Sequence, residues 1–209
     1  MRIIVLLPLL AAAAVGFVPG SQRRVIRGIT LGASGLSLLC ALIAFCSFEV
    51  GSSDLQFETK WIWVKDLRLY FHLAADGINI GIILMGAIVA FAAACCADDI
   101  THRVKEFHIL LNLMIGGILG AFASMDLFFF YFFHELALVP TFIMIGVWGR
   151  GANRNYATYK ITLYLSLGAL LALIGLIGVY VQVDVKSFSI PDLIATVQES
   201  PIDESAQQW

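Results

Sequence analysis

One stretch of this sequence combines a long apolar run with a carboxyl group near its middle. Residues 126–148, DLFFFYFFHELALVPTFIMIGVW, are apolar almost throughout, and Glu135 lies well inside them. At about 1.5 Å per residue, a helix of this length crosses a hydrocarbon core about 30 Å thick. A charged side chain at that depth costs at least about 2.5 to 3.5 kcal/mol. We therefore predict a membrane-spanning helix in which the carboxyl group has a function.

The rest of the chain has the composition of a polytopic membrane protein. Hydrophobic residues make up 60% of the 209 positions and charged residues 13%, whereas a soluble domain has about 25% charged residues. The net charge of -2 argues against a nucleic-acid partner. The four cysteines form no CxxC pair and have no histidine at metal-ligand spacing, so we predict no metal site. The predicted fold class is all-α.

Apolar runs separated by short polar connections predict six transmembrane helices in a single membrane domain, 1–209. Their approximate bounds are 3–18, 29–48, 78–97, 107–124, 126–148 and 157–181. The first run also fits a signal peptide, with Arg2 before an apolar core and an alanine-rich stretch after it. We favour a span, because the basic cluster at 23–27 follows at once and tends to stay in the cytoplasm.

Two polar intervals are expected on the outer side. The loop 49–75 alternates apolar and polar residues, which predicts a surface hairpin, and an irregular loop is the alternative. The tail 182–209 is polar and acidic, with a short helix after Pro191. Lysine and arginine gather in the loops of the other side, so both termini are predicted outside.

Two interpretations of Glu135 compete. It is either a neutral acid that hydrogen-bonds a neighbouring helix or a carboxyl that binds and releases a proton on a transport path. Burial favours the protonated form and an approaching lysine favours the charged form, so lysine movement would change proton affinity. We favour the second interpretation. Lys160 lies nearer the cytoplasmic side, with a depth difference of on the order of 15 Å, so the two should not touch. His134 is either a core histidine or a second proton site.

Other residues have structural interpretations. Asp76, before Gly77, and Asp126 are predicted helix N-caps, and Asn112 an interhelical hydrogen-bonding residue. His102 and His108 are predicted to be interfacial. Pro140 removes an N–H donor one turn beyond Glu135 and predicts a kink. Small residues predict close helix contacts at two sets of positions, Gly28, Gly32, Ser34 and Gly35 in the second span and Gly116, Gly117 and Gly120 in the fourth.

Residues 111–149, LNLMIGGILGAFASMDLFFFYFFHELALVPTFIMIGVWG, resemble the fourth and fifth helices of a known family. This family comprises the antiporter-like subunits of proton-pumping NADH-quinone oxidoreductase, respiratory complex I, and the likeness is greatest to chain M, the subunit 4 type. The resemblance extends from about residue 61 to 180. Its supporting matches are Asp76-Gly77-Ile78, Trp148-Gly149, Lys160, Tyr164 and Gly168.

The resemblance implies a role in proton translocation. Glu135 falls on the family's intramembrane glutamate, Pro140 on its following proline and Lys160 on a lysine commonly found there, which makes Lys160 a further candidate for the proton path. It also implies that the chain carries no cofactor, because NADH, flavin, iron-sulfur clusters and quinone belong to partner subunits. The implied partners are the other membrane subunits of complex I, the lipid bilayer and protons. By analogy, the membrane is a bacterial inner membrane.

The sequence departs from the family pattern in its length. The family's lysine partner of the glutamate lies on a seventh helix, beyond residue 209. The chain is therefore expected to be a fragment, with a companion chain or an inactive product as alternatives. A subunit of a multisubunit sodium/proton antiporter or of a membrane-bound hydrogenase would have the same helices. A purely structural role is a third possibility.

Overall fold

The computed structural model describes residues 1–51, 54–65, 69–151, 153–182 and 187–199. Of the predicted outer loop 49–75 and tail 182–209, residues 52–53, 66–68, 183–186 and 200–209 lie outside these residues. The helices are α1 Arg2–Phe17, α2 Arg23–Cys46, α3 Asn79–Cys96, α4 Val104–Ala123, α5 Leu127–Trp148, α6 Arg154–Gln182 and α7 Ile190–Glu199. A short 3-10 turn, η1 Ala97–Asp99, follows α3, and the two strands are β1 Gln56–Val64 and β2 Leu69–Ala75. The protein is therefore mostly helical.

Five helices, α2 to α6, are long and apolar enough to cross a membrane. The sixth predicted span corresponds to α1, an apolar helix of 16 residues, which at about 1.5 Å per residue is about 24 Å long. The structure therefore supports five of the six predicted spans by length, and the assignment of α1 as a span stays a prediction. The apolar helices identify an integral membrane protein.

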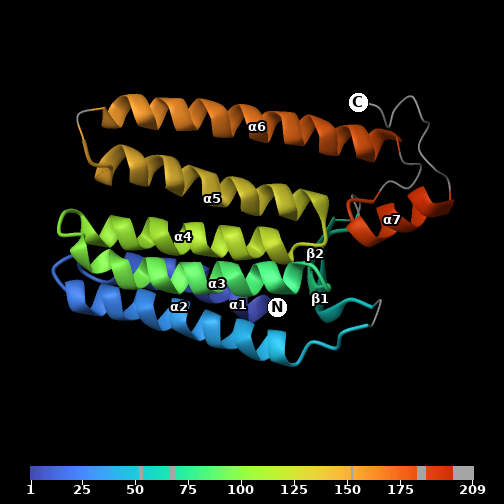
Figure 1. Ribbon diagram of the computed structural model, residues 1–209, viewed down its shortest axis with the longest axis horizontal. Helices are drawn as coiled ribbons and strands as arrows, with labels where there is room; N and C mark the ends of the chain where they lie inside the picture. Colours follow the sequence, from blue (N-terminus) through green and yellow to red (C-terminus); the bar gives the residue numbers. More distant parts are fainter. Residues whose placement is uncertain (52–53, 66–68, 152, 183–186, 200–209) are drawn as a thin grey trace.

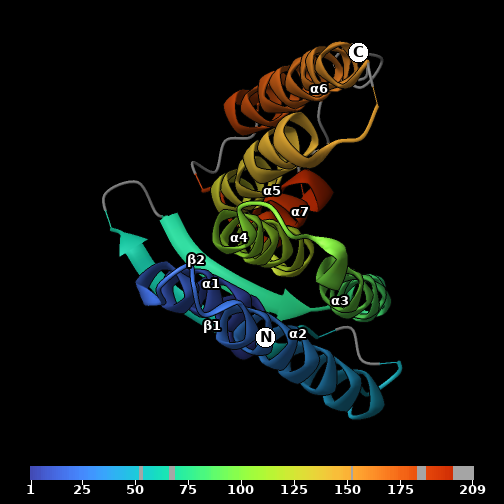
Figure 2. The same cartoon turned by 90° about the vertical axis from the view of Figure 1, so that its left-hand side faces the viewer.

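The spanning helices run antiparallel to their neighbours in sequence and form a bundle, which α5 and α6 extend on one side (Figure 1). Helices α1 to α4 pack closely, and their buried side chains form the main core, which includes Val5, Ile83, Ile115 and Leu119. Helix α5 lies on α4, and α6 lies at the edge of the bundle beside α5 (Figure 2). Most of the α6 side chains are consequently exposed.

The predicted surface hairpin is confirmed at one end of the bundle. Strands β1 and β2 pair antiparallel, with Trp61 opposite Phe71 and Lys60 opposite His72. The connection between α4 and α5 continues this layer, because the Met125 N–H donates to the His72 carbonyl over 2.9 Å and Ser124 bridges Leu73. We call this group of elements the hairpin end.

The alternation of apolar and polar residues is not matched by alternating burial in β2. Most of the strand is buried, and even the polar His72 is only 1% exposed. The reason is the connection between α4 and α5, which pairs with β2 and covers it. Residues 188–190 are joined to that connection in turn, since the Leu127 N–H donates to the Phe188 carbonyl over 2.8 Å and the Ile190 N–H to the Met125 carbonyl over 2.9 Å.

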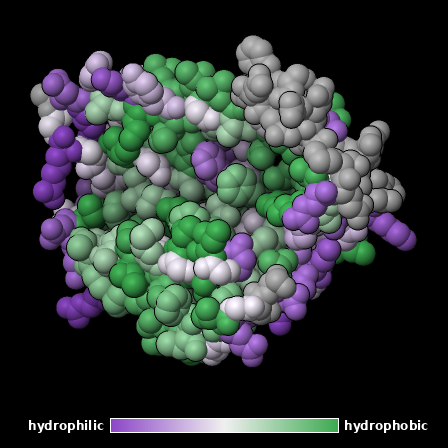
Figure 3. Space-filling model, turned by 45° about the vertical axis from the view of Figure 1, so that its right-hand side comes forward, coloured by the Kyte–Doolittle hydropathy of each residue, from purple (hydrophilic) through white to green (hydrophobic). Residues whose placement is uncertain are grey.

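The opposite end of the bundle carries most of the basic residues, and we call it the basic end. There the Lys105 ammonium donates to the Gly16 carbonyl at the end of α1 over 2.8 Å, and the Trp148 Nε1–H donates to the His102 carbonyl over 2.8 Å. A space-filling view shows hydrophilic side chains gathered at the two ends and a broad hydrophobic surface between them (Figure 3). This distribution is that of a helix bundle that spans a bilayer.

Candidate functional site

The start of α5 is fixed by the Asp126 side chain. Asp126 has an extended backbone, and its Oδ1 accepts from the Phe128 N–H over 3.0 Å and from the Phe129 N–H over 3.3 Å. Its Oδ2 accepts from the Tyr70 N–H of β2 over 3.4 Å. The predicted N-cap is therefore confirmed, and the same carboxyl joins the helix start to the hairpin. This contact sets the depth of every residue of α5, Glu135 included.

Glycines of α4 set which side of α5 faces the core. A Cβ atom on Gly117 would lie 2.7 Å from the Ala137 nitrogen and 2.9 Å from the Phe133 carbonyl oxygen. A Cβ atom on Gly120 would lie 2.5 Å from the Phe133 ring. The predicted close approach at these two glycines is confirmed, because only a residue without a side chain leaves room for the α5 backbone and for Phe133.

The same contact places Glu135 on a different side of α5 from Phe133 and Ala137. Glu135 is two residues from both Phe133 and Ala137, which at 3.6 residues per turn is about 200° around the helix. The carboxyl is about 12 Å along α5 from Leu127, well inside the helix. Its side chain is 37% exposed in the described chain. Glu135 is therefore well inside a helix long enough to span a membrane, on a face of α5 that the described helices cover only in part.

A cavity of about 310 Å³ lies beside this carboxyl. Its lining is apolar apart from Glu135 and comes from α4 and α5, namely Leu110, Leu113, Phe132, Glu135, Leu136, Val139 and Pro140. Pro140 is buried, has no N–H for the Leu136 carbonyl, and is followed by Thr141, whose hydroxyl donates to the Ala137 carbonyl over 2.9 Å. The helix continues through Pro140 to Trp148. The site is thus a single carboxyl at an apolar cavity, next to a turn with a missing backbone donor.

Tyr131 and His134 lie closest to the carboxyl among the polar residues of α5. The Tyr131 side chain interacts with Glu135 one turn further along, and it stacks on the His134 ring. The His134 Nδ1 lies 3.9 Å from a Glu135 oxygen, and its side chain is 43% exposed. His134 is therefore partly buried among the described residues, and its two interpretations stay predictions.

Lys160 is separate from Glu135. It lies about 9 Å from the start of α6, at the basic end, and its ammonium lies 5.7 Å from the centre of the Tyr156 ring. In the part of the chain that the structure describes, Lys160 forms no ion pair with a carboxylate. Across the same residues, no three His, Cys, Asp or Glu side chains are grouped as a metal site would require.

His108 lies near the start of α4, as predicted, but it is buried among helices, and the structure shows a second polar cluster that the sequence did not reveal. His108 is 1% exposed, because α1 and α2 cover the first turns of α4. Asn112, one turn further, donates from Nδ2 to the Thr30 hydroxyl of α2 over 2.8 Å, which confirms its predicted role between helices. Thr30, Ser34 and Ser37 follow helical spacing along one face of α2, and that spacing is the signal that could have indicated a polar partner.

Comparison with known proteins places this arrangement in context. Residues 124–208 match a family described as NADH:quinone oxidoreductase/Mrp antiporter, transmembrane. The chain is 34% identical to the chloroplastic NAD(P)H-quinone oxidoreductase chain 4 of Angiopteris evecta over 183 residues, which are 86% of this chain and 37% of the relative. It is 31% identical to NAD(P)H-quinone oxidoreductase chain 4 of Gloeobacter violaceus, over 93% of this chain and 36% of the relative. The chain thus spans somewhat more than a third of the length of these relatives.

Solved structures contain the same fold. A chain of respiratory complex I from Thermus thermophilus with bound NADH superposes with a TM-score of 0.79 at 26% identity, covering 99% of this chain and 40% of that chain. A chain of an archaeal membrane-bound sulfane sulfur reductase superposes with a TM-score of 0.77 at 20% identity, covering 95% and 30%. The second likeness concerns the fold alone.

Proposed function

Since this chain belongs to the antiporter-like membrane subunits of NADH:quinone oxidoreductase, of which it spans somewhat more than a third of the length, we propose that it contributes to proton translocation. In this proposal the complete subunit moves protons when its complex passes electrons from NADH to quinone. The chemistry of flavin, iron-sulfur clusters and quinone would be carried by partner subunits. The chain itself would do no redox chemistry.

Glu135 is proposed as the group that carries the proton. The observation on which this depends is its position, about 12 Å inside α5, at a cavity whose other lining side chains are apolar. A carboxyl in such a place binds a proton when no cation is near and releases it when one approaches. The cation would reach it from the face of α5 opposite Phe133 and Ala137, because α4 occupies the other side.

Lys160 is proposed as a further member of the path at the basic end, without direct contact with Glu135. Asp76 is proposed to hold the start of α3 at the hairpin end, where its Oδ1 accepts from the Ile78 and Asn79 N–H groups over 2.8 and 2.6 Å. Gly77, next to Asp76, is proposed to have a structural role at the start of α3. Pro140 is proposed to have a structural role inside α5.

We also propose an orientation. The start of α1 and the helix α7 lie at the hairpin end (Figure 1), and the lysine and arginine residues of the short loops lie at the basic end. Short loops rich in these residues stay in the cytoplasm. The basic end would therefore be cytoplasmic, with both termini outside, in a bacterial inner membrane and in contact with other membrane subunits of the complex.

The test is a Glu135→Gln substitution in the complete subunit within its complex. Glutamine keeps the shape of the side chain but carries no exchangeable carboxyl proton. In inverted membrane vesicles given NADH, acidification of the lumen should fall strongly, while the amount of assembled complex and its NADH oxidation with an artificial acceptor are retained.

Glu106→Gln is the matched control. Glu106 lies at the basic end of α4, 3.7 Å from the Arg103 guanidinium and half exposed, so the same chemical change there should leave acidification unchanged. Full acidification by Glu135→Gln would refute the role of this carboxyl.

A second candidate function is antiport, since the family description also names an Mrp antiporter, and we take the exchanged ions to be sodium and protons. It predicts a sodium-dependent proton flux in vesicles that receive no NADH. The proposed function predicts that proton movement stops when NADH is withheld. The two functions are thus distinguished in one preparation.

A further inference from the structure

The polar cluster between α2 and α4 is buried and shielded from lipid. Thr30 is fully buried, and Ser34 and Ser37 are 1% exposed. The two serines are satisfied by backbone, since Ser34 donates to the Thr30 carbonyl over 2.9 Å and Ser37 to the Ile4 carbonyl of α1 over 3.3 Å. Asn112, also fully buried, uses its amide nitrogen twice, toward the Thr30 hydroxyl and the His108 carbonyl, each over 2.8 Å.

Three atoms of this cluster have no protein partner. Both ring nitrogens of His108 and the Oδ1 of Asn112 are buried and make no hydrogen bond to the described residues. Buried polar atoms are hydrogen-bonded in almost all proteins, and an atom left without a partner costs the free energy of its desolvation. One such atom is an exception, whereas three on side chains one turn apart indicate a shared ligand.

The chemistry of the three atoms fits water. A neutral imidazole has one N–H donor and one acceptor nitrogen, and an amide oxygen is an acceptor. A water molecule donates two hydrogen bonds and accepts two, so it can accept from the ring N–H and donate to Oδ1. A second water molecule can serve the remaining ring nitrogen. Buried waters in proteins occupy polar sites of this kind and bind groups that have no other partner.

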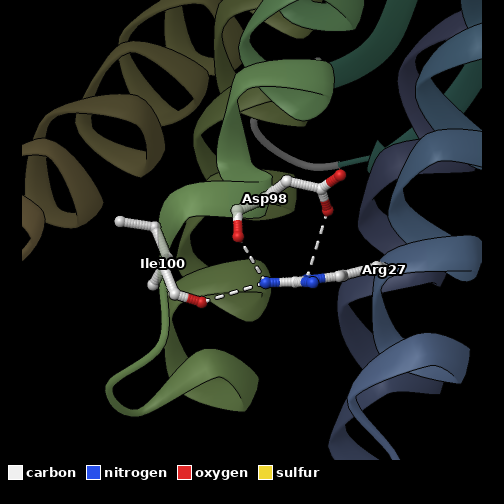
Figure 4. Close-up of polar contacts among 3 residues, drawn as sticks. All are labelled: Arg27, Asp98 and Ile100. Atoms are coloured by element: carbon white, nitrogen blue, oxygen red, sulfur yellow. Dashed lines mark hydrogen bonds and ion pairs between the residues drawn. The ribbon is translucent and has the colours of Figure 1, made fainter.

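The cluster lies in the part of α4 that is next to the basic end. His108 is about 6 Å and Asn112 about 12 Å along α4 from Val104. Arg27, one turn before Thr30 on α2, crosses to the segment after α3, where its guanidinium donates to the carbonyls of Asp98 and Ile100 over 2.6 and 3.2 Å (Figure 4). Its Nε lies 3.4 Å from the Asp98 carboxylate. The Arg27 side chain is 27% exposed and is therefore in contact with both the solvent and the protein interior.

We propose that Thr30, His108 and Asn112 form a hydrated polar site that is supplied with water from the basic end, past the Arg27–Asp98 bridge. This site is distinct from the cavity at Glu135. Leu110 and Leu113, which line that cavity, lie about 200° and 140° around α4 from His108, so the helix separates the two. The hydrated site does not depend on the proposed proton-carrying role of Glu135.

The test measures water at His108 directly. The full-length chain, with ¹⁵N-labelled histidine, is placed in lipid bilayers, and magnetisation transfer from water to the imidazole nitrogens is recorded by solid-state NMR. The His108 signal is identified by its loss in His108→Phe. We expect transfer to His108 at a rate like that of the exposed His102, although the His108 side chain is buried.

Substitution of Asn112 provides the second measurement. Asn112→Leu keeps the volume of the side chain but removes the amide, so transfer to His108 should be lost. Asn155→Leu, at an exposed position of α6, should leave it unchanged. If Asn112→Leu fails to fold, Thr30→Val is nearly isosteric and should reduce the transfer, because the hydroxyl that orients the Asn112 amide is removed.

A wild-type His108 that receives no magnetisation from water would overturn the proposal. Transfer that is unaffected by both Asn112→Leu and Thr30→Val would overturn it as well. Glu135→Gln should not alter the His108 signal, so failure of this proposal and failure of the proton-carrying role of Glu135 are separately visible.

Discussion

The close contact between α4 and α5 at Gly117 predicts that replacing this glycine by alanine destabilises the protein. In Gly117→Ala, the new Cβ atom would lie 2.7 Å from the Ala137 nitrogen and 2.9 Å from the Phe133 carbonyl oxygen, and ordinary contacts begin at 3.4 Å. Both atoms are backbone, so no side-chain rotation relieves the overlap. Helix α5 must move away from α4 over the turn that precedes Pro140.

The magnitude follows from two opposing terms. Replacing glycine by alanine inside a helix stabilises it by about 0.5 to 1 kcal/mol, and forcing extra atoms into a packed interface costs about 1 to 3 kcal/mol. We therefore expect Gly117→Ala to destabilise the protein by up to about 2.5 kcal/mol. Gly28→Ala is the matched control. No atom lies within 4 Å of the position that the new Cβ atom would take there, so this variant should be more stable by about 0.5 to 1 kcal/mol.

The assay is the unfolding of the full chain in mixed micelles, followed by tryptophan fluorescence as the fraction of sodium dodecyl sulfate is raised. The free energies of unfolding of the two variants are compared with that of the unsubstituted protein. The opposite signs are the informative result. If Gly117→Ala is as stable as Gly28→Ala, the close approach of α5 to α4 at this glycine is wrong, and so is the direction assigned to Glu135.

Two further predictions concern the hairpin end. Asp126→Ala removes the N-cap of α5 and should lower the free energy of unfolding by about 0.5 to 2 kcal/mol, whereas Asp126→Asn should retain most of it, and equal losses in the same assay would contradict the capping role. Burial lowers the pKa of His72 below its usual 6.5. The Glu58 carboxylate opposes that shift, because its Oε1 lies 2.9 Å from the His72 Nε2. The unfolded chain then takes up a proton before the folded one, so stability should fall as the pH drops below 6.5. His72→Gln should flatten this dependence while His102→Gln leaves it intact, and an unchanged slope in His72→Gln would contradict the assignment.

Features that depend on neighbouring residues were predictable. Asp76 and Asp126 precede apolar runs, and each accepts hydrogen bonds from the helix start that follows it. The alternating residues before α3 do form a hairpin. These features follow from local patterns, because a cap or a strand pair a few residues away is encoded within one short stretch.

Small residues were an unreliable guide to helix contacts. Gly117 and Gly120 bring α5 close, whereas no atom lies within 4 Å of the Cβ positions of Gly28 and Gly32, and Gly35 meets only the Phe91 ring. A glycine permits a close approach but does not specify a partner. His108 shows the same difficulty, since its place one turn inside α4 suggested an interface and the packing of α1 and α2 buries it.

The sequence by itself determined that this protein lies in a membrane, where its long helices run, and that Glu135 lies well inside one of them, because hydrophobicity and helix rise are properties of each segment alone. The tertiary structure decided which way each helix faces. The orientation of Glu135 depends on glycines of another helix, and the bridge over the buried His108 joins Arg27 to Asp98, 71 residues apart. Rotation about a helix axis is set by contacts with distant segments, and those contacts exist only in the folded chain.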